Sequence, residues 1–365
     1  MNRNLKKIWP ALAMSLVLAT SCINAADNTN MTQSKSNANA QQKGSMGMIT
    51  PPVNPVVQGV DFSLGAEALY MRATEDSSAV GVLTPGSTAY PQTYTTAEQP
   101  YDWSWGARVN AGYAMPHDGW DLAAQWTWFH SSHTRDRLAP TGSSYLSTVE
   151  DPVLVTTLNN SDATALVESS GLNSTRRLYI NMGDLDLGRE FFISKWLTLR
   201  PCLGARGVWI ERKLTVATSD ITRYPTGLAT HTSSVTTHSK GSYNAGGIYF
   251  GLNTQWGFGD GWSLFGVFDQ SFVYGQNHVT IKEIDTAGTV KYTRAAGDDK
   301  WNTVRGITDL AIGLRWDYLF DNDNYRFRLQ AAWEEHLFSN LDVSNFGSHG
   351  DLALTGASFS ASFDF

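Results

Sequence analysis

The sequence predicts an all-β protein: an antiparallel up-and-down transmembrane β-barrel of about ten strands, with short periplasmic turns and long outer loops. Three observations predict it. Ten segments alternate between apolar and polar side chains, aromatic residues stand at the ends of the apolar faces, and the connections alternate in length. Alternation of this kind gives a tilted strand one face for lipid and one for the lumen. Twelve strands are the alternative if a long loop contains a further hairpin.

The composition excludes several other classes of protein. Only 17% of the 365 residues are charged, while 12% are aromatic. A chain with so many aromatic side chains would not remain disordered, since these side chains drive collapse. Beyond residue 25 there is no apolar run of about 20 residues, as a membrane-spanning helix requires. The aromatic residues must therefore be accommodated by short strands.

The chain begins with a targeting segment. Residues 1–25 consist of a basic start, an apolar stretch too short to span a bilayer and a run of small residues, which is typical of a signal peptide. We expect cleavage after Ala25, and lipidation at Cys22 is the alternative. Residues 26–57 are polar and then proline-rich, so we expect a flexible periplasmic segment. The barrel domain is expected over residues 58–365.

The strands follow in order along this domain. Six segments keep one phase of alternation: 62–70, 102–113, 120–128, 197–209, 309–318 and 325–334. Three further segments, 176–189, 243–256 and 262–274, are strand-like, and in the first of them the apolar residues change parity, which suggests a β-bulge. The last, 351–365, places Phe359, Phe363 and Phe365 on one face. A terminal Phe on such a strand is typical of the signal that the barrel-assembly machinery recognises.

Aromatic residues bracket the apolar faces, as two membrane–water interfaces select. The predicted aromatic girdle consists of Trp103, Tyr113, Trp120, Trp128, Tyr325 and Trp333. Short turns are expected at 114–119, 190–196, 257–261 and 321–324. Long outer loops are expected at about 73–100, 131–175, 211–240, 275–303 and 337–350. Both termini then lie in the periplasm, which requires an even number of strands.

Several phrases of the sequence resemble one bacterial family. They are Tyr101-Asp102-Trp103-Ser104-Trp105-Gly106-Ala107-Arg108, Pro116-His117-Asp118-Gly119-Trp120-Asp121-Leu122, Leu185-Asp186-Leu187-Gly188-Arg189, Lys195-Trp196-Leu197-Thr198-Leu199-Arg200-Pro201 and Gly261-Trp262-Ser263-Leu264-Phe265-Gly266. The chain resembles the Legionella major outer-membrane protein family, which has chlamydia-like relatives, over about residues 58–365. The resemblance implies a pore-forming outer-membrane protein. Disulfide cross-linking, described for the Legionella members, is in doubt here because the mature chain keeps only Cys202.

The leading functional hypothesis is a porin that passes small hydrophilic solutes or ions through a charged lumen. The residues predicted to line it are Glu67, Asp102, Arg108, Asp121, Asp186, Arg200, Arg206, Asp309, Arg315, Arg326, Arg328 and Glu334. Five of them form a basic stripe, which favours anions: Arg200, Arg206, Arg315, Arg326 and Arg328. However, barrels of about eight strands are usually filled by their own side chains, so pairing across a ten-stranded lumen could plug it.

The alternative is a structural or adhesive barrel whose long outer loops meet a host or surface partner. An enzyme is disfavoured, since the rim offers only a loose set of candidates: His130, His133, Asp136, His336, His349 and Asp351. No cofactor, metal site or nucleic-acid interface is indicated. Outer-membrane lipid is the expected surrounding, and the sequence is compatible with a monomer or a homo-oligomer.

Overall fold

The computed structural model describes residues 61–76, 79–85, 95–115, 119–138, 143–147, 167–168, 170–223, 232–287, 289–321, 325–342 and 350–365. Every regular element in these residues is a β-strand. None of them forms a helix long and apolar enough to cross a membrane. The predicted signal peptide and the segment 26–57 lie outside the described residues.

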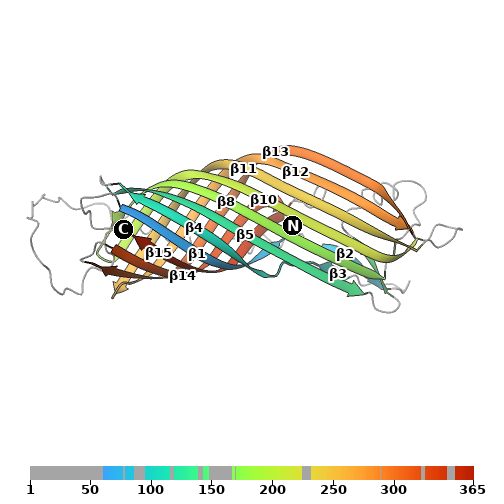
Figure 1. The fold of residues 1–365 in the computed structure, drawn as a ribbon, viewed down its shortest axis with the longest axis horizontal. Helices are drawn as coiled ribbons and strands as arrows, with labels where there is room; N and C mark the ends of the chain where they lie inside the picture. Colours follow the sequence, from blue (N-terminus) through green and yellow to red (C-terminus); the bar gives the residue numbers. More distant parts are fainter. Residues whose placement is uncertain are drawn as a thin grey trace, which may run out of the picture. The chain divides into compact units, whose positions relative to one another are not determined.

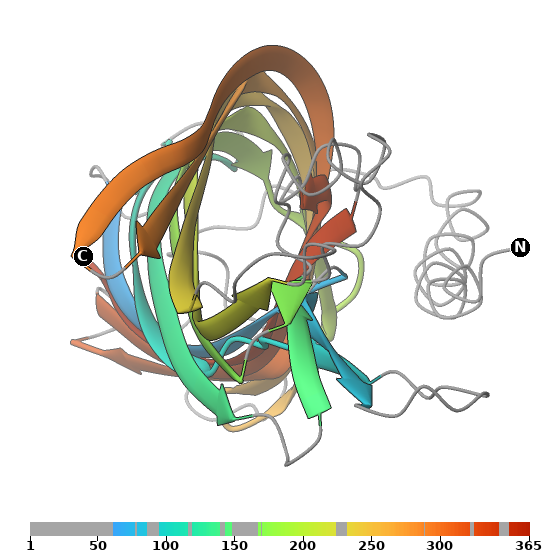
Figure 2. The ribbon, with the colours of Figure 1, turned by 90° about the vertical axis from the view of Figure 1, so that its right-hand side faces the viewer.

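Ten long strands close into one antiparallel barrel (Figures 1 and 2). In spatial order they are β1 (Asp61–Glu75), β4 (Trp103–Ala114), β5 (Trp120–Leu138), β8 (Gly171–Arg189), β10 (Leu197–Arg223), β11 (Thr232–Gly259), β12 (Trp262–Ala287), β13 (Val290–Phe320), β14 (Tyr325–Asp342) and β15 (Gly350–Asp364). The first and last strands pair, and Phe62 and Phe365 exchange backbone hydrogen bonds of 2.9 and 2.8 Å. The prediction of ten strands is confirmed, and closure leaves no edge strand in the barrel.

The barrel has two different ends. The short turns, the start of β1 and the end of β15 lie at one end, which we call the short-turn end, and the distal parts of the long strands define the hairpin end (Figure 1). Between β11 and β12, Asp260 and Gly261 have φ angles of 51° and 80°. Two consecutive positive φ values suit the right-handed twist of paired strands in a two-residue hairpin. At the same end, β9 (Phe191–Phe192) pairs with β10.

Four strands are much longer than the predicted segments. β10 to β13 contain 27, 28, 26 and 31 residues, whereas a tilted strand needs about 9–11 residues to cross the membrane. Much of the ranges 211–240 and 275–303, expected as loops, is therefore strand that continues the barrel wall. These extensions carry polar residues on both faces, so they lack the alternation that marked the membrane-spanning parts.

A small second sheet covers part of the hairpin end. It consists of β2 (Ala79–Pro85), β3 (Thr95–Glu98) and β6 (Ser143–Ser147), while the two-residue β7 (Val167–Glu168) pairs with β10. Val80 and Ala97 of this sheet pack against Leu172, Leu214 and Val216 of the barrel. The expected loops 73–100 and 131–175 thus contribute ordered structure next to the barrel opening.

The outer wall of the barrel is apolar and aromatic. Five of the predicted girdle residues, Trp103, Trp120, Trp128, Tyr325 and Trp333, are among the exposed large hydrophobic residues, and Tyr113 is half-buried against the ring of Phe62. Phe359, Phe363 and Phe365 also face outward. Side chains exposed on this wall while the interior is closed are consistent with contact with lipid.

The change of parity in the segment 176–189 is not a bulge. β8 pairs with β5 and β10 in continuous register throughout. Leu185 and Leu187 face outward, whereas Leu178, Ile180 and Met182 face inward and are buried. The strand keeps its phase, and along the chain the apolar residues pass from the inner face, at 178–182, to the outer face, at 185–187.

We predict that a charge on the outer wall is costly only within the membrane. Ile312→Lys should destabilise the refolded barrel by about 2–4 kcal/mol, because a charge near the bilayer midplane loses its hydration. Val290→Lys, at an exposed position in the distal β12–β13 hairpin, should change stability by no more than about 0.5 kcal/mol. Urea unfolding of both variants in lipid vesicles measures the difference, and equal costs would place Ile312 outside the lipid.

Candidate functional site in the barrel interior

The principal cavity of the described residues lies inside the barrel and has a volume of about 360 Å³. It extends from the short-turn end, where Ala114, Glu190 and Asp364 line it, to the middle of the barrel at Met182 and Asp309. All ten barrel strands or their adjoining turns contribute to its wall. The cavity therefore occupies one half of the lumen and is the candidate functional site.

Charged side chains dominate this cavity. Six arginines line it, namely Arg108, Arg200, Arg206, Arg315, Arg326 and Arg328. Nine carboxylates line it as well: Glu67, Asp121, Asp184, Asp186, Glu190, Asp269, Asp309, Glu334 and Asp364. Because the carboxylates outnumber the arginines, the basic stripe seen in the sequence does not give the cavity a positive charge. The expectation of anion preference loses its basis.

Arg108 on β4 connects three strands. Its guanidinium Nη1 lies 3.1 Å from Glu67 Oε2 on β1, and its Nη2 lies 2.9 Å from Glu334 Oε2 on β14. Thr127 on β5 accepts a hydrogen bond from Nε. Both carboxylates and the guanidinium are buried, so their attraction is screened little by water. A single cation thus holds two carboxylates that would otherwise repel each other.

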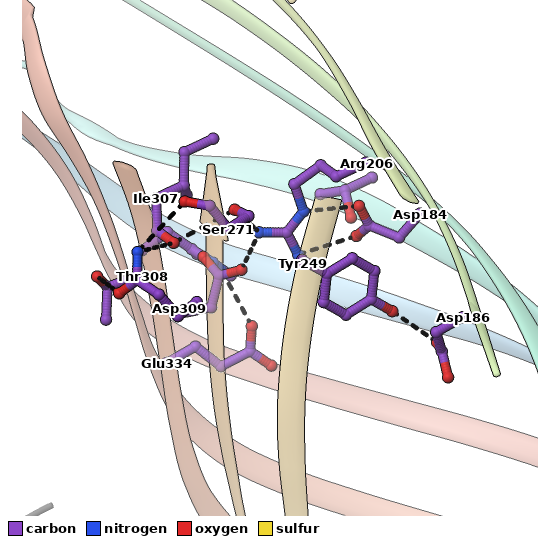
Figure 3. Close-up of polar contacts among 12 residues, drawn as sticks. Asp184, Asp186, Arg206, Tyr249, Ser271, Ile307, Thr308, Asp309 and Glu334 are labelled. Carbon is purple, nitrogen blue, oxygen red and sulfur yellow. Dashed lines mark hydrogen bonds and ion pairs between the residues drawn. The ribbon is translucent and has the colours of Figure 1, made fainter. Parts of the chain in front are cut away.

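Arg206 on β10 makes a second connection across the lumen (Figure 3). It binds Asp184 on β8 in a bidentate manner, with Nε 2.7 Å from Oδ1 and Nη2 3.2 Å from Oδ2. Its Nη1 donates to Asp309 on β13 and to Ser271 Oγ on β12. The planar guanidinium provides the fork of donors that this arrangement needs.

His336 on β14 joins these two clusters. Its Nδ1 lies 2.8 Å from Asp309 Oδ1, and its Nε2 lies 3.3 Å from Glu334 Oε2. Ser358 on β15 donates a hydrogen bond to Glu334 as well. The sequence placed His336 at the outer rim, whereas the structure buries it in the lumen because β14 extends beyond the predicted end of its strand.

A third cluster surrounds Arg200 on β10. Its guanidinium binds Asp121 on β5 and Asp186 on β8, and the hydroxyl of Tyr249 on β11 donates to Asp186 across 2.7 Å (Figure 3). Tyr249 reaches β8 by crossing over Gly204 of β10, to which both Tyr249 and Asp186 are paired in register. A Cβ at Gly204 would lie 2.6 Å from Cε1 of the Tyr249 ring. Gly204 is thus the residue that allows this contact.

The short-turn end of the cavity holds further arginines. Arg326 pairs with Asp364, and Arg328 Nε lies 2.8 Å from Asp317 Oδ1. Arg315 donates to Gln255 across 2.6 Å. Burial raises the pKa of Glu190 in the turn after β8 above its ordinary value, against the opposing attraction of Arg328 and Arg326.

An apolar layer closes the lumen beyond the charged cavity. Its buried residues come from most of the barrel strands: Leu69, Met71, Ala73, Phe129, Leu178, Ile180, Met182, Val208, Ile210, Tyr243, Val273, Ile307, Phe338, Leu352 and Leu354. These side chains are between 0 and 3% exposed, so little space for water remains between them. The charged lining predicted from the sequence therefore does not extend through the middle of the barrel.

A second polar cluster lies on the hairpin side of the apolar layer. Arg176 and Arg212 surround Glu75, and the Tyr101 hydroxyl donates to Glu75 across 3.1 Å. A cavity of only about 20 Å³ remains beside them. In the described residues the lumen therefore consists of a charged cavity, an apolar layer and a compact polar cluster, in that order from the short-turn end.

Of the twelve residues predicted to line a pore, eleven line the cavity, and Asp102 does not. Asp102 lies just before β4 at the hairpin end, where its exposed carboxylate pairs with His133. Among the other rim candidates, His130 faces outward against the ring of Tyr179, and Asp136 accepts a hydrogen bond from Asn173. Asp351 accepts one from the Asn340 backbone, and His349 lies outside the described residues. The rim candidates do not meet in one site.

Several residues of the network were not predicted. Asp184 and Asp269 stand on strands whose phase was left uncertain, and Asp364 shares the polar face of the last strand. Tyr249 was counted only as part of a strand. Asp184 could have been predicted, because it lies two residues before Asp186 and therefore points to the same face of the strand. Nothing in the sequence identified which residues pair across the lumen.

The described residues contain no group of three potential ligands that could hold a metal ion. Cys202 is a buried, free thiol on the inner face of β10. The chemistry of the interior is that of paired ions and hydrogen bonds.

The fold and its interior define a class of protein: a closed antiparallel β-barrel with an apolar outer wall and a charged lumen. The family model of the Legionella pneumophila major outer membrane protein precursor matches residues 57–365. The chain belongs to this family, which confirms the resemblance seen in its strands and turns and places it in the outer membrane.

Three solved structures that match this chain are remote from it in sequence. The outer membrane protease OmpT of Escherichia coli is 9% identical over 84% of this chain and 96% of its own, with a TM-score of 0.36. A major outer membrane protein of Thermus thermophilus is 10% identical over 84% and 100%, with a TM-score of 0.27. The toluene transporter TodX of Pseudomonas putida is 9% identical over 86% and 92%, with a TM-score of 0.25. At these TM-scores nothing about function follows. Among curated proteins there is no match.

We predict that the buried network is far more sensitive to loss of a charge than the surface is. Asp309→Asn should cost about 3–5 kcal/mol, because Arg206 and His336 would lose their shared partner inside the barrel. Asp298→Asn is the matched control, since Asp298 also pairs with a histidine, His278, but its side chain is 62% exposed against 9% for Asp309. That change should cost less than about 1 kcal/mol. Equilibrium unfolding in urea measures both, and similar costs would contradict this role of the internal network.

Proposed function

We propose that this protein is a narrow outer-membrane channel of the porin type, which passes small hydrophilic ions or solutes and is closed at rest. The observation that carries the proposal is the charged cavity of about 360 Å³, which reaches from the middle of the barrel to the short-turn end. A barrel that served only as a wall could fill this space with apolar side chains, which need no partners. A lumen lined with ionised groups is what channels use to replace the water around a solute.

Passage through this channel requires the apolar layer to move. In the described conformation the side chains of Phe129, Ile180 and Phe338 close the lumen above the charged cavity. Apolar constrictions can gate a pore by excluding water, and they conduct once they widen and become wet. We therefore propose that opening consists of displacement of this layer, with the charged cavity acting as the vestibule on the periplasmic side.

A second candidate function is that of a structural or adhesive surface barrel. The apolar layer itself favours it, because such a dense layer keeps the lumen shut. The long β10–β11 and β12–β13 hairpins would then carry the activity by meeting a surface partner. The two candidates differ in one measurable property, the conductance of the barrel.

We predict that wild-type barrels in planar bilayers show small, infrequent current steps. Phe129→Ala combined with Phe338→Ala should raise the open probability at least tenfold, because each truncated side chain removes about 3–5 kcal/mol of packing, and about 1.4 kcal/mol corresponds to a factor of ten. The control is Phe250→Ala combined with Phe272→Ala, a ring pair on the outer wall, which should leave gating unchanged. Silence of the wild type and of the widened variant would support the structural barrel instead.

We also predict a preference for cations once the channel conducts. Asp269 and Glu190 are the cavity carboxylates for which the described residues offer no ion pair, so no cation of the protein neutralises them when a passing solute finds them ionised. Asp269→Asn with Glu190→Gln should move the reversal potential in a salt gradient towards zero. The paired carboxylate variant Asp121→Asn is the comparison, and an unchanged potential in the double variant would remove these two residues from the ion path.

A further inference from the structure

The outer wall carries a row of three cations on adjacent strands. Lys213 on β10 is paired in register with Arg177 on β8 and with Lys240 on β11. All three side chains point outward. The residues just before them, Arg176, Arg212 and Ser239, face the interior, and successive residues of a strand point to opposite faces. Adjacent strands lie about 4.8 Å apart, so the row spans roughly 10 Å.

Such a row is unfavourable unless an anion compensates it, since like charges directly opposite each other on paired strands repel. The protein supplies part of this compensation through Glu211, whose carboxylate lies 2.6 Å from Lys213 Nζ and 2.8 Å from Lys240 Nζ. No described residue forms an ion pair with Arg177. One carboxylate for three cations leaves the row with a positive charge of about two.

The row lies directly beyond the aromatic end of the outer wall. On β10 the exposed Trp209 precedes Glu211 and Lys213, and on β5 the exposed Trp128 precedes His130. Tyr179 of β8 stands between these levels: its ring stacks on His130 with centroids 4.3 Å apart and lies 5.5 Å from Lys213 Nζ. Aromatic rings of this kind mark the depth of the lipid headgroups. The cations are therefore at the level where the headgroups begin.

We propose that Arg177, Lys213 and Lys240, together with Tyr179, form a binding site for the phosphate groups of a lipid in the outer leaflet. Lysine and arginine are the usual partners of phosphate, and the alkyl stems of Lys213 and Lys240 can lie along the apolar wall while their ammonium groups meet the headgroup. These lysines are 42 and 49% exposed. Acyl chains of the same lipid would lie against Trp209 and the wall below it, which a free phosphate ion cannot exploit.

The test uses the refolded full chain in detergent micelles that contain bisphosphorylated lipid A, with bound lipid counted by native mass spectrometry. Lys213→Gln with Lys240→Gln should lower the affinity roughly 30-fold, since each basic residue near an anionic lipid surface contributes about a factor of five. Glu211→Gln should raise the affinity, because it removes the competing carboxylate. Heat-modifiable migration on a gel verifies that each variant is folded.

The matched control is Lys291→Gln with Lys300→Gln, which removes the same charge from exposed positions on β13, a strand that is separated from Lys240 by the whole of β12. Its affinity for lipid A should equal that of the wild type. Equal losses in the two double variants would overturn the proposal, because the binding would then follow net charge alone. Displacement of lipid A by inorganic phosphate at the same concentration would also overturn it, since the site would then recognise a free anion and not a lipid.

Discussion

The structure depends on one constraint: ionised side chains are enclosed by a ring of ten strands, where water compensates them less than it does at the surface. A buried charge without a partner costs several kcal/mol, so each must find an opposite charge across the lumen. The contacts of Arg108, Arg206 and Arg200, extended by His336, Ser271, Tyr249 and Ser358, reach a side chain on every strand of the barrel. Each strand is therefore tied to the others through the interior as well as through its neighbours' backbone. A barrel of this kind holds its register by its lumen as much as by its wall.

The order of layers along the lumen follows from the same constraint. Ion pairs are strengthened where water is excluded, and the apolar layer of Phe129, Ile180 and Phe338 excludes it from one side of the Arg108 and Arg206 clusters. The layer in turn needs a closed ring of strands to pack against, which the ion pairs maintain. Neither part would be stable alone: an apolar layer open to water would collapse the barrel, and a water-filled charged lumen would weaken each pair. Displacement of the layer would hydrate the ions beneath it, so the two parts are expected to loosen together.

Alternation along the strands was sufficient to predict the fold, because lipid selects apolar side chains at every second position and leaves a clear periodicity. It predicted the inward face of Arg108, Arg200, Arg206 and Arg315 for the same reason. It did not predict where β10 to β13 end, since their distal parts meet water on the outside and need no apolar face. It misplaced Asp102 by extending the polar parity of β4 one residue beyond the strand. Which charges become partners depends on how the strands are aligned with one another around the barrel. The alternation within a single strand does not reveal this alignment.

The inner and outer walls solve the same electrostatic problem in different ways. Inside, Arg206 meets two aspartates, because the protein is the only source of anions there. Outside, Lys213 faces two further cations across neighbouring strands and shares a single carboxylate with Lys240. A purely structural network would place acidic residues at these positions, as it does a few residues away in the lumen. The difference is accounted for if the missing anion belongs to the surroundings, and a membrane whose outer surface carries phosphate supplies it at the depth where the aromatic rings end.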